Sequence, residues 1–303
     1  MATLLSVTTF SASNLPDLTG RTAVVTGANS GIGRVAARVL AARGARVVLA
    51  VRRVDKGREA ASTMPGSVEV RELDLADLAS VRAFASGFGD EVDLLVNNAG
   101  IMIPPLNRTA DGFESQFGTN HLGHFALTNL LLPRITGRVV TVSSGAHRAG
   151  KIDFADLNWE RKPYKAMAAY GQSKLANLLF SAELQRRLTA AGSPVLATTA
   201  HPGLAATNLF RPHGENGPLD RIVNAGVRAV GQSDEGGALP TLHAALADVP
   251  GNSFSGPGGL LGRGAPKLVS RSKAAQDADL ARRLWTASEE LTGVTFPLPL
   301  PTA

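Results

Sequence analysis

Residues 22–33 read Thr-Ala-Val-Val-Thr-Gly-Ala-Asn-Ser-Gly-Ile-Gly, and this stretch decides the fold. The first five residues form a short apolar run suited to a buried parallel strand. Three glycines then lead into a helix expected over about 32–43. Such glycines let the backbone approach a pyrophosphate closely, and the helix N-terminus offers it free N–H groups. A plain tight turn is the alternative, but the flanking strand and helix favour a dinucleotide site. The residues predicted to bind its phosphates are Gly27, Asn29, Ser30, Gly31, Ile32 and Gly33.

Strands and helices are expected to alternate along the rest of the chain. The patterns predict strands at 46–51, 68–73, 92–96, 138–142 and 195–200, and helices at 77–88, 111–132, 166–188 and 273–291. This alternation indicates a parallel sheet with helices on both faces, and right-handed crossovers make it a doubly wound α/β fold of the Rossmann type. We expect three layers (α/β/α) in a single domain over 18–303, preceded by an N-terminal arm over 1–17. Ligands should bind beyond the carboxyl ends of the strands.

The end of the second strand bears on the choice of cofactor. It reads Ala-Val-Arg-Arg, with Arg52 and Arg53 where NAD-preferring sites place an acid for the ribose hydroxyls. A guanidinium suits a 2′-phosphate because its donors form a planar fork. The alternative is that one or both arginines are solvated surface charge. The sequence therefore predicts NADP(H) in preference to NAD(H).

Several further motifs follow in a fixed order: Asn97-Asn98-Ala99-Gly100, Asn120, Ser144, Tyr170-x-x-x-Lys174 and Pro202-Gly203. With the glycine loop, they resemble the pattern of the classical short-chain dehydrogenases/reductases over about residues 18–292. The stretches that begin at Asn120, Tyr170 and Leu284 are most similar to the branch of the retinol dehydrogenases and the WW-domain oxidoreductase. The resemblance implies an oxidoreductase that moves a hydride between a nicotinamide cofactor and a hydroxyl/carbonyl pair. It also implies a homodimer or homotetramer.

The resemblance further implies roles for the residues at matching positions. Asp74 would hold the adenine amino group, Asn97 and Ala99 would lie along the adenosine, and Thr207 would contact the nicotinamide side. Asn120 would hold a water in a proton relay to Lys174. The remaining positions expected along the cofactor are Leu75, Gly100, Pro202 and Gly203.

The chemistry explains why Tyr170 and Lys174 stand four residues apart. Reduction of a ketone needs a hydride on carbon, supplied by the cofactor, and a proton on oxygen, supplied by the protein. A free phenol has a pKa near ~10. Lys174 lies one helical turn along, so its positive charge is expected to lower the pKa of Tyr170. Ser144, after the fifth strand, can hydrogen-bond the substrate oxygen. The Tyr164-Lys165 pair nearby lacks this spacing.

Two segments stand apart from the sheet-forming pattern. An insertion over about 147–165 contains Trp159 and Tyr164, whose rings could line a substrate entrance or anchor the loop. The retinol-dehydrogenase-like branch has a similar insertion. The segment over about 204–234 follows the sixth strand, and the resemblance makes it a substrate lid.

Composition excludes several other function classes. The chain has no cysteine, which excludes disulfides, thiolate metal sites and cysteine nucleophiles. Its net charge of +6 is spread evenly and no basic run exceeds two residues, which argues against a nucleic-acid partner. His121 and His124 are three residues apart on one helix face, but no further ligands stand nearby in sequence. We expect them to pack or form hydrogen bonds, and we predict no metal site.

No stretch approaches the ~18 apolar residues of a membrane span, and residues 1–18 lack the charged start of a signal peptide. The sequence thus predicts a cytoplasmic protein. We expect its substrate to be a small-molecule alcohol, ketone or aldehyde. A catalytically silent protein that senses NADP(H) is the alternative, although such proteins often lose the tyrosine or the lysine, and both are present here.

Overall fold

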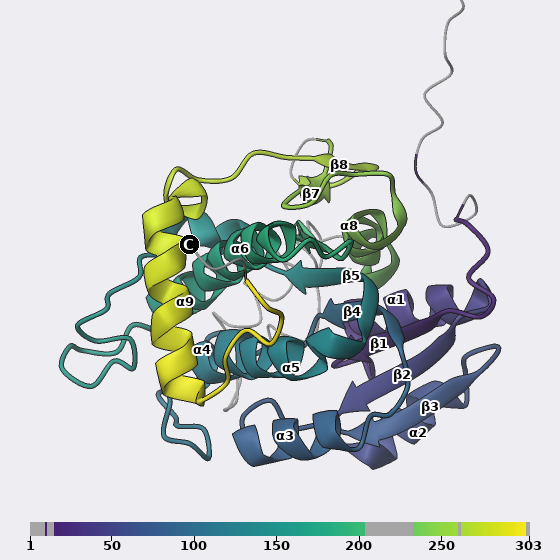
Figure 1. The fold of residues 1–303 in the computed structure, drawn as a ribbon, viewed down its shortest axis with the longest axis horizontal. Helices are drawn as coiled ribbons and strands as arrows, with labels where there is room; N and C mark the ends of the chain where they lie inside the picture. Colours follow the sequence, from purple (N-terminus) through teal and green to yellow (C-terminus); the bar gives the residue numbers. More distant parts are fainter. Residues whose placement is uncertain (1–9, 11–14, 204–232, 260–261, 301–303) are drawn as a thin grey trace, which may run out of the picture.

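The computed structural model describes residues 10, 15–203, 233–259 and 262–300, and Figure 1 shows their arrangement. One eight-stranded sheet runs in the order β3-β2-β1-β4-β5-β6-β7-β8. Neighbouring strands are parallel from β3 to β7, and only β8 pairs antiparallel to its neighbour β7. The strands are β1 (Thr22–Thr26), β2 (Arg46–Val51), β3 (Val68–Glu72), β4 (Val92–Asn97), β5 (Ile135–Val142), β6 (Leu196–Ala200), β7 (Phe254–Pro257) and β8 (Pro266–Leu268).

Helices cover both faces of this sheet, so the predicted three-layer Rossmann-type fold is confirmed. The α-helices are α1 (Gly31–Ala42), α2 (Val54–Ala61), α3 (Leu78–Ser86), α4 (Ser115–Phe117), α5 (Gly123–Leu131), α6 (Ala166–Ala190), α8 (Asp234–Leu246) and α9 (Ala278–Thr292). Helices α1, α2 and α8 pack on one face, and α3, α5 and α6 pack on the other. The strand order reverses between β1 and β4, which is where a doubly wound sheet opens a ligand crevice.

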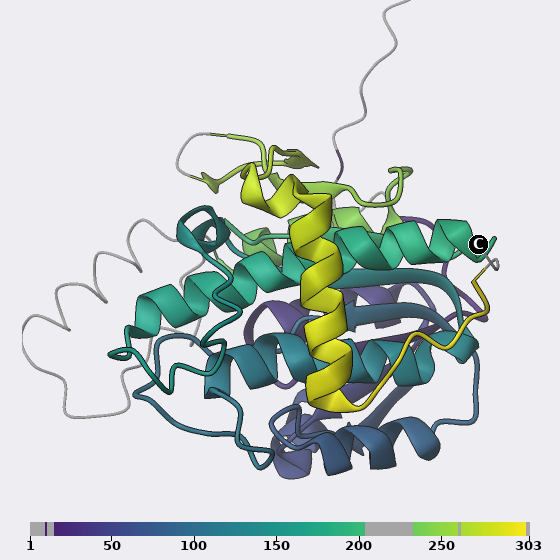
Figure 2. The ribbon, with the colours of Figure 1, turned by 60° about the vertical axis from the view of Figure 1, so that its left-hand side comes forward.

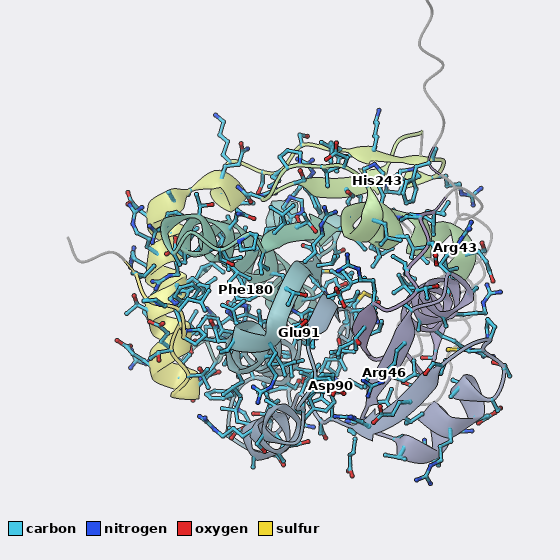
Figure 3. All side chains as sticks on the ribbon, turned by 45° about the vertical axis from the view of Figure 1, so that its right-hand side comes forward. Arg43, Arg46, Asp90, Glu91, Phe180 and His243 are labelled. Atoms are coloured by element: carbon cyan, nitrogen blue, oxygen red, sulfur yellow. The ribbon has the colours of Figure 1, made fainter. Side chains whose placement is uncertain are left out.

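Helix α9 adds a further layer outside α6 and crosses it, as Figure 2 shows. Trp285 of α9 is 1% exposed and lies between Phe180 of α6, with which it stacks, and Phe125 of α5, which it meets edge-on. The Phe180 label in Figure 3 lies in this core. Such aromatic contacts fix the C-terminal helix on the domain and extend the hydrophobic core beyond the two main helical layers.

The predicted elements are largely present, with two differences in the helices. The helix expected over 111–132 begins at Ser115 and is interrupted by a π-helical turn at Gly118–Leu122. Glu114 causes the late start, because its buried carboxylate accepts hydrogen bonds from the N–H groups of the first turn. Helices α2 and α8 were not expected; α2 carries a low apolar content, and Pro240 lies inside α8.

Ion pairs connect residues at the opposite end of the sheet, near the amino end of β2. Arg46, which begins β2, binds Asp90 at 2.6 Å and Glu69 at 2.8 Å, and Figure 3 labels the first two. Because these groups are partly exposed, the pairs contribute little to stability. Across the described ranges, no helix is both long and apolar enough to cross a bilayer.

Candidate active site

A cleft of about 270 Å³ lies beyond the carboxyl ends of β1, β2, β4 and β5. Many of the residues predicted from the sequence line it. These are Gly27, Asn29, Ser30, Gly31, Ile32, Gly33, Arg52, Asp74, Leu75, Ala99, Gly100, Tyr170, Lys174 and Pro202. These residues are far apart in the sequence, and the order of the strands brings them to one end of the sheet.

The glycine loop wraps tightly against the turn that follows β4. Gly27 has a φ of 66°, and a Cβ there would lie 2.9 Å from the Cα of Ala99. A Cβ on Gly33 would collide with the side-chain amide of Asn98 and the carbonyl of Gly27. Only glycine therefore fits at either position. The result is a bare backbone cradle at the N-terminus of α1, which fits the pyrophosphate of a dinucleotide.

The two arginines at the end of β2 have different surroundings. Arg52 lines the cleft and has no ion-pair partner among the residues that the structure describes. Arg53 stands outside the cleft lining, precedes α2 and binds Asp55 at 3.2 Å, with 61% of its side chain exposed. Both arginines are exposed, but only Arg52 belongs to the lining of the cleft.

The turn after β4 holds two neighbouring asparagines whose side chains lie on different sides. Asn97, predicted to lie along the adenosine, instead points into the core, where its amide donates to Thr128 Oγ1 at 2.8 Å. Side chains alternate along a strand, so the next residue faces the other way. Asn98 lines the cleft, and its amide donates to the carbonyl of Thr26 at 2.8 Å.

The phenol of Tyr170 lies against Ser144 at the end of β5. Tyr170 is 6% exposed on α6, and the Ser144 side chain lies close enough to its hydroxyl to lower its pKa. The preceding serine has another task, because Ser143 Oγ donates to the carbonyl of Lys174 at 2.7 Å. Ser143 lines the cleft and Ser144 does not, yet only Ser144 has the contact with the phenol that the chemistry requires.

Burial decides the proton affinities of the tyrosine and the lysine. Desolvation raises the pKa of Tyr170 to about 12, and the Ser144 hydrogen bond opposes this rise. Desolvation also lowers the pKa of Lys174 to about 8. The expected lowering of the Tyr170 pKa by Lys174 does not appear: burial of the phenol sets the direction, and Ser144 alone opposes it. The lysine Nζ is 3.3 Å from the carbonyl oxygen of Val142, to which it donates.

Asn120 sits in the π-helical turn between α4 and α5. Its Oδ1 accepts from the Ile101 N–H at 2.8 Å, and its Nδ2 donates to the Ile101 carbonyl at 2.9 Å and to Ser173 Oγ at 3.0 Å. Asn120 does not line the cleft itself. Its side chain instead holds the backbone of Ile101 against the helix that carries Tyr170 and Lys174.

The aromatic residues of the insertion anchor it rather than line the cleft. Trp159 is 8% exposed and meets Tyr164 edge-on, with their ring centroids 5.6 Å apart. The Tyr164 hydroxyl donates to Glu114 Oε1 at 3.0 Å and accepts from Gln116 Nε2 at 2.9 Å. The insertion is therefore tied to the segment that leads into Asn120.

Some residues lie elsewhere than the motif order suggests, and some were missed. Gly203 lies just beyond the cleft lining, and Thr207, with most of the expected lid, falls outside the described residues. The unforeseen lining residues adjoin the motifs in sequence: Ala50, Val51, Leu73, Asn98, Ile101, Thr119, Val142 and Ser143. Their nearness to motif residues was the only signal that could have found them.

The two histidines on the helix after Asn120 form hydrogen bonds. His121 Nε2 is 2.9 Å from Ser288 Oγ of α9, and His124 Nε2 is 2.9 Å from Thr26 Oγ1. In the part of the chain that the structure describes, no group of three or more His, Asp or Glu side chains could hold a metal ion.

One cleft thus combines a glycine cradle with the cluster of Ser144, Tyr170 and Lys174. The family model described as short chain dehydrogenase matches residues 21–217. The chain belongs to the short-chain dehydrogenase/reductase family. As a member of it, this protein is an oxidoreductase that acts on CH–OH groups with NAD(P).

Similar proteins indicate the branch of the family to which this short-chain dehydrogenase/reductase is related. It is 45% identical to human retinol dehydrogenase 13 over 296 residues, which cover 92% of this chain and 86% of the relative. It is 42% identical to mouse polyprenol dehydrogenase over 299 residues, with 92% and 86% covered. A crystal structure of an uncharacterized protein from Mycobacterium paratuberculosis is 55% identical, with a TM-score of 0.84, covering 96% of this chain and all of that one. The resemblance to the retinol dehydrogenases is therefore confirmed.

Proposed function

We propose that this protein is an NADP(H)-dependent alcohol dehydrogenase/carbonyl reductase with Tyr170 as its acid/base. The observation that carries the proposal is the cluster at the end of the cleft, where a buried phenol lies next to Ser144 and shares a helix with the buried Lys174. No other tyrosine competes for this role, because the Tyr164 hydroxyl is engaged with Glu114 and Gln116.

The cleft would bind the dinucleotide along its lining. The glycine cradle would hold the pyrophosphate, and Asp74 and Leu75 would lie near the adenine. Ala99, Gly100, Pro202, Gly203 and Thr207 would follow the rest of the cofactor toward its nicotinamide side. When bound, the nicotinamide supplies the hydride for reduction or accepts it in oxidation.

The preference for NADP(H) rests on Arg52. This residue lines the cleft at the end of β2, and no acidic side chain of β2 stands there for the ribose hydroxyls. A charge-assisted contact from Arg52 to a 2′-phosphate would discriminate NADP(H) from NAD(H). Arg53, paired with Asp55, would add little.

The protein's part in reduction is to deliver a proton to the substrate oxygen. The Tyr170 hydroxyl would donate it, and the Ser144 hydroxyl would hold the same oxygen. In oxidation the Tyr170 oxygen would take the proton from the alcohol. Lys174, buried next to the phenol, would stabilise the phenolate when protonated and pass a proton outward through a water at Asn120.

A panel of alcohols, aldehydes and ketones, followed at the NADPH absorbance with both cofactors, tests this function. We expect turnover with NADPH at a kcat/KM at least tenfold above that with NADH. Nucleotide binding without turnover on any of the panel would contradict it and would favour a silent cofactor sensor instead.

A further inference from the structure

His124 lies between the glycine cradle and the turn that contains Asn120. Its ring is 1% exposed on α5, outside the residues assigned a role so far. The Nε2 atom is 2.9 Å from Thr26 Oγ1, and the Nδ1 atom is 3.0 Å from the carbonyl oxygen of Asn120. One side chain thus contacts both the strand that enters the glycine loop and the turn that holds Asn120.

The partners of the ring fix its protonation. A carbonyl oxygen only accepts, so Nδ1 carries the proton and donates to Asn120. The lone pair on Nε2 then accepts from the Thr26 hydroxyl. Burial lowers the pKa of His124 to about 4, so the ring stays neutral near pH 7 and keeps both hydrogen bonds.

Thr26 extends this connection to the lining of the cleft. Its Oγ1 accepts from the N–H groups of Asn98 and Ala99, each at 2.9 Å. The nearer acceptor for its own proton is His124 Nε2 at 2.9 Å, and the carbonyl oxygen of Val96 lies at 3.3 Å, so every hydrogen-bonding position of the hydroxyl is used. Thr26 is the last residue of β1, and Gly27 follows it directly. The position of the cradle and of the turn after β4 therefore depends on one hydroxyl that His124 orients.

Asn120 continues the connection on the other side. Its backbone carbonyl is held by His124, and its side chain holds Ile101 and Ser173, the residue before Lys174. The His124 ring therefore braces the carbonyl of a residue inside the π-helical turn.

We propose that His124 is a positioning residue for the reaction, joining the cofactor cradle through Thr26 to the Asn120 turn that supports the proton relay. It would hold the nicotinamide, which transfers the hydride, in a fixed position relative to Tyr170, which transfers the proton. Small displacements between reacting groups lower the rate strongly. This inference rests on the proposed function, because it assumes that the cleft binds NADP(H) and that Asn120 serves the relay.

Two substitutions of His124 each remove one of its two hydrogen bonds and keep the other. In His124→Asn the amide nitrogen falls near the position of Nδ1, which keeps the donor to Asn120 and loses Thr26. In His124→Gln the amide oxygen falls near the position of Nε2, which keeps the acceptor for Thr26 and loses Asn120. We expect His124→Asn to raise the Kd for NADPH about tenfold with kcat within about twofold. We expect His124→Gln to leave the Kd nearly unchanged and to lower kcat about tenfold, as the loss of one buried hydrogen bond implies.

Thr26→Val gives a second approach that leaves the histidine in place. It should raise the Kd for NADPH as His124→Asn does, and the double variant should be no worse than either single one, because both remove the same hydrogen bond. Thr26→Ser keeps the hydroxyl and should restore wild-type binding. Binding is measured by NADPH fluorescence, which needs no turnover.

His121→Gln is the matched control. His121 stands one turn earlier, is equally buried at 1% exposure and bonds Ser288 rather than the site. It should change the free energy of unfolding, and it should produce neither the selective rise in the Kd for NADPH nor the selective fall in kcat. If the His124 and Thr26 variants alter only stability, as His121→Gln does, the inference is overturned. Turnover retained in Tyr170→Phe would instead overturn the proposed function, while the NADPH Kd of the His124 variants would still test the contact with Thr26.

Discussion

The ammonium of Lys174 lies 5.6 Å from the centroid of the Tyr170 ring, and both groups are buried. Burial pushes their pKa values apart, to about 12 for the phenol and about 8 for the lysine. Each neutral form is favoured by desolvation, and only a hydrogen bond or a neighbouring charge can restore the ionised form. The ionisation of the pair, and with it catalysis, therefore depends on the polarity of its surroundings.

Removal of the Ser144 hydroxyl should move the pH profile. Oxidation needs the phenolate of Tyr170, so its kcat/KM should rise with pH as the phenol loses its proton. Because the Ser144 hydrogen bond lowers the pKa of Tyr170, Ser144→Ala should shift this rise to higher pH. The rate of alcohol oxidation, measured from pH 6 to 10 in both proteins, checks the direction. A shift to lower pH would show that Ser144 does not stabilise the phenolate.

Lys174 should lower the stability of the fold that it serves. Its folded pKa of about 8 is below its ordinary value of 10.5, so between these values the unfolded chain binds a proton that the folded chain has released. Stability attributable to this group therefore rises with pH across that window, and below it the full cost remains. Lys174→Met should raise the free energy of unfolding at pH 7 by about 1–3 kcal/mol while abolishing turnover.

Urea unfolding at pH 7 and pH 9.5 measures this effect. The variant should gain more over the wild type at pH 7 than at pH 9.5. A variant less stable than the wild type at pH 7 would mean that the lysine is stabilised by its surroundings rather than strained by burial.

Arg52 and Arg53 form a matched pair for cofactor choice. Arg52→Ala should raise the KM for NADPH roughly 10–100-fold, as the loss of a charge-assisted contact implies, and should change the KM for NADH little. Arg53→Ala should change neither, because its guanidinium is exposed and paired with Asp55. Steady-state kinetics with both cofactors decide this. An equal rise for NADPH and NADH in Arg52→Ala would remove it as the phosphate contact.

Gly33 should tolerate no side chain. A Cβ there would overlap the amide of Asn98 and the carbonyl of Gly27, so Gly33→Ala should displace the cradle and weaken NADPH binding by at least tenfold. Gly89→Ala is the control, because a Cβ at that position meets no atom within 4 Å. Equal NADPH affinity in the two variants, measured by fluorescence titration, would show that the cradle does not form the binding site.

The sequence allowed most of the sheet to be predicted because its strands are short apolar runs between clear turn signals. The strands Thr22–Thr26 and Arg46–Val51 have the expected bounds, since a strand buried on both faces needs a continuous apolar run. Strand β7 and helix α8 were hidden, because glycine and proline in their sequences indicate loops and only tertiary packing makes them regular.

The site could be predicted in part for a related reason. Tyr170 and Lys174 share a helix, so their spacing alone places them together. The orientation of Asn97 and the separate surroundings of Arg52 and Arg53 depend on where each strand ends, to within one residue. The hydrogen bonds of His124 join residues 98 positions apart, and no local pattern indicates such a contact.

The substitution Tyr170→Phe tests the central claim most directly. It removes one oxygen from a buried ring and keeps the shape of the cleft, so NADPH should bind as tightly as in the wild type. Turnover on any carbonyl substrate should fall by roughly 10²–10⁴-fold, since the proton donor is lost. NADPH affinity by fluorescence and kcat by NADPH absorbance, measured on the same preparation, give both quantities. Retained turnover with unchanged NADPH binding would contradict the assignment of Tyr170 as the acid/base.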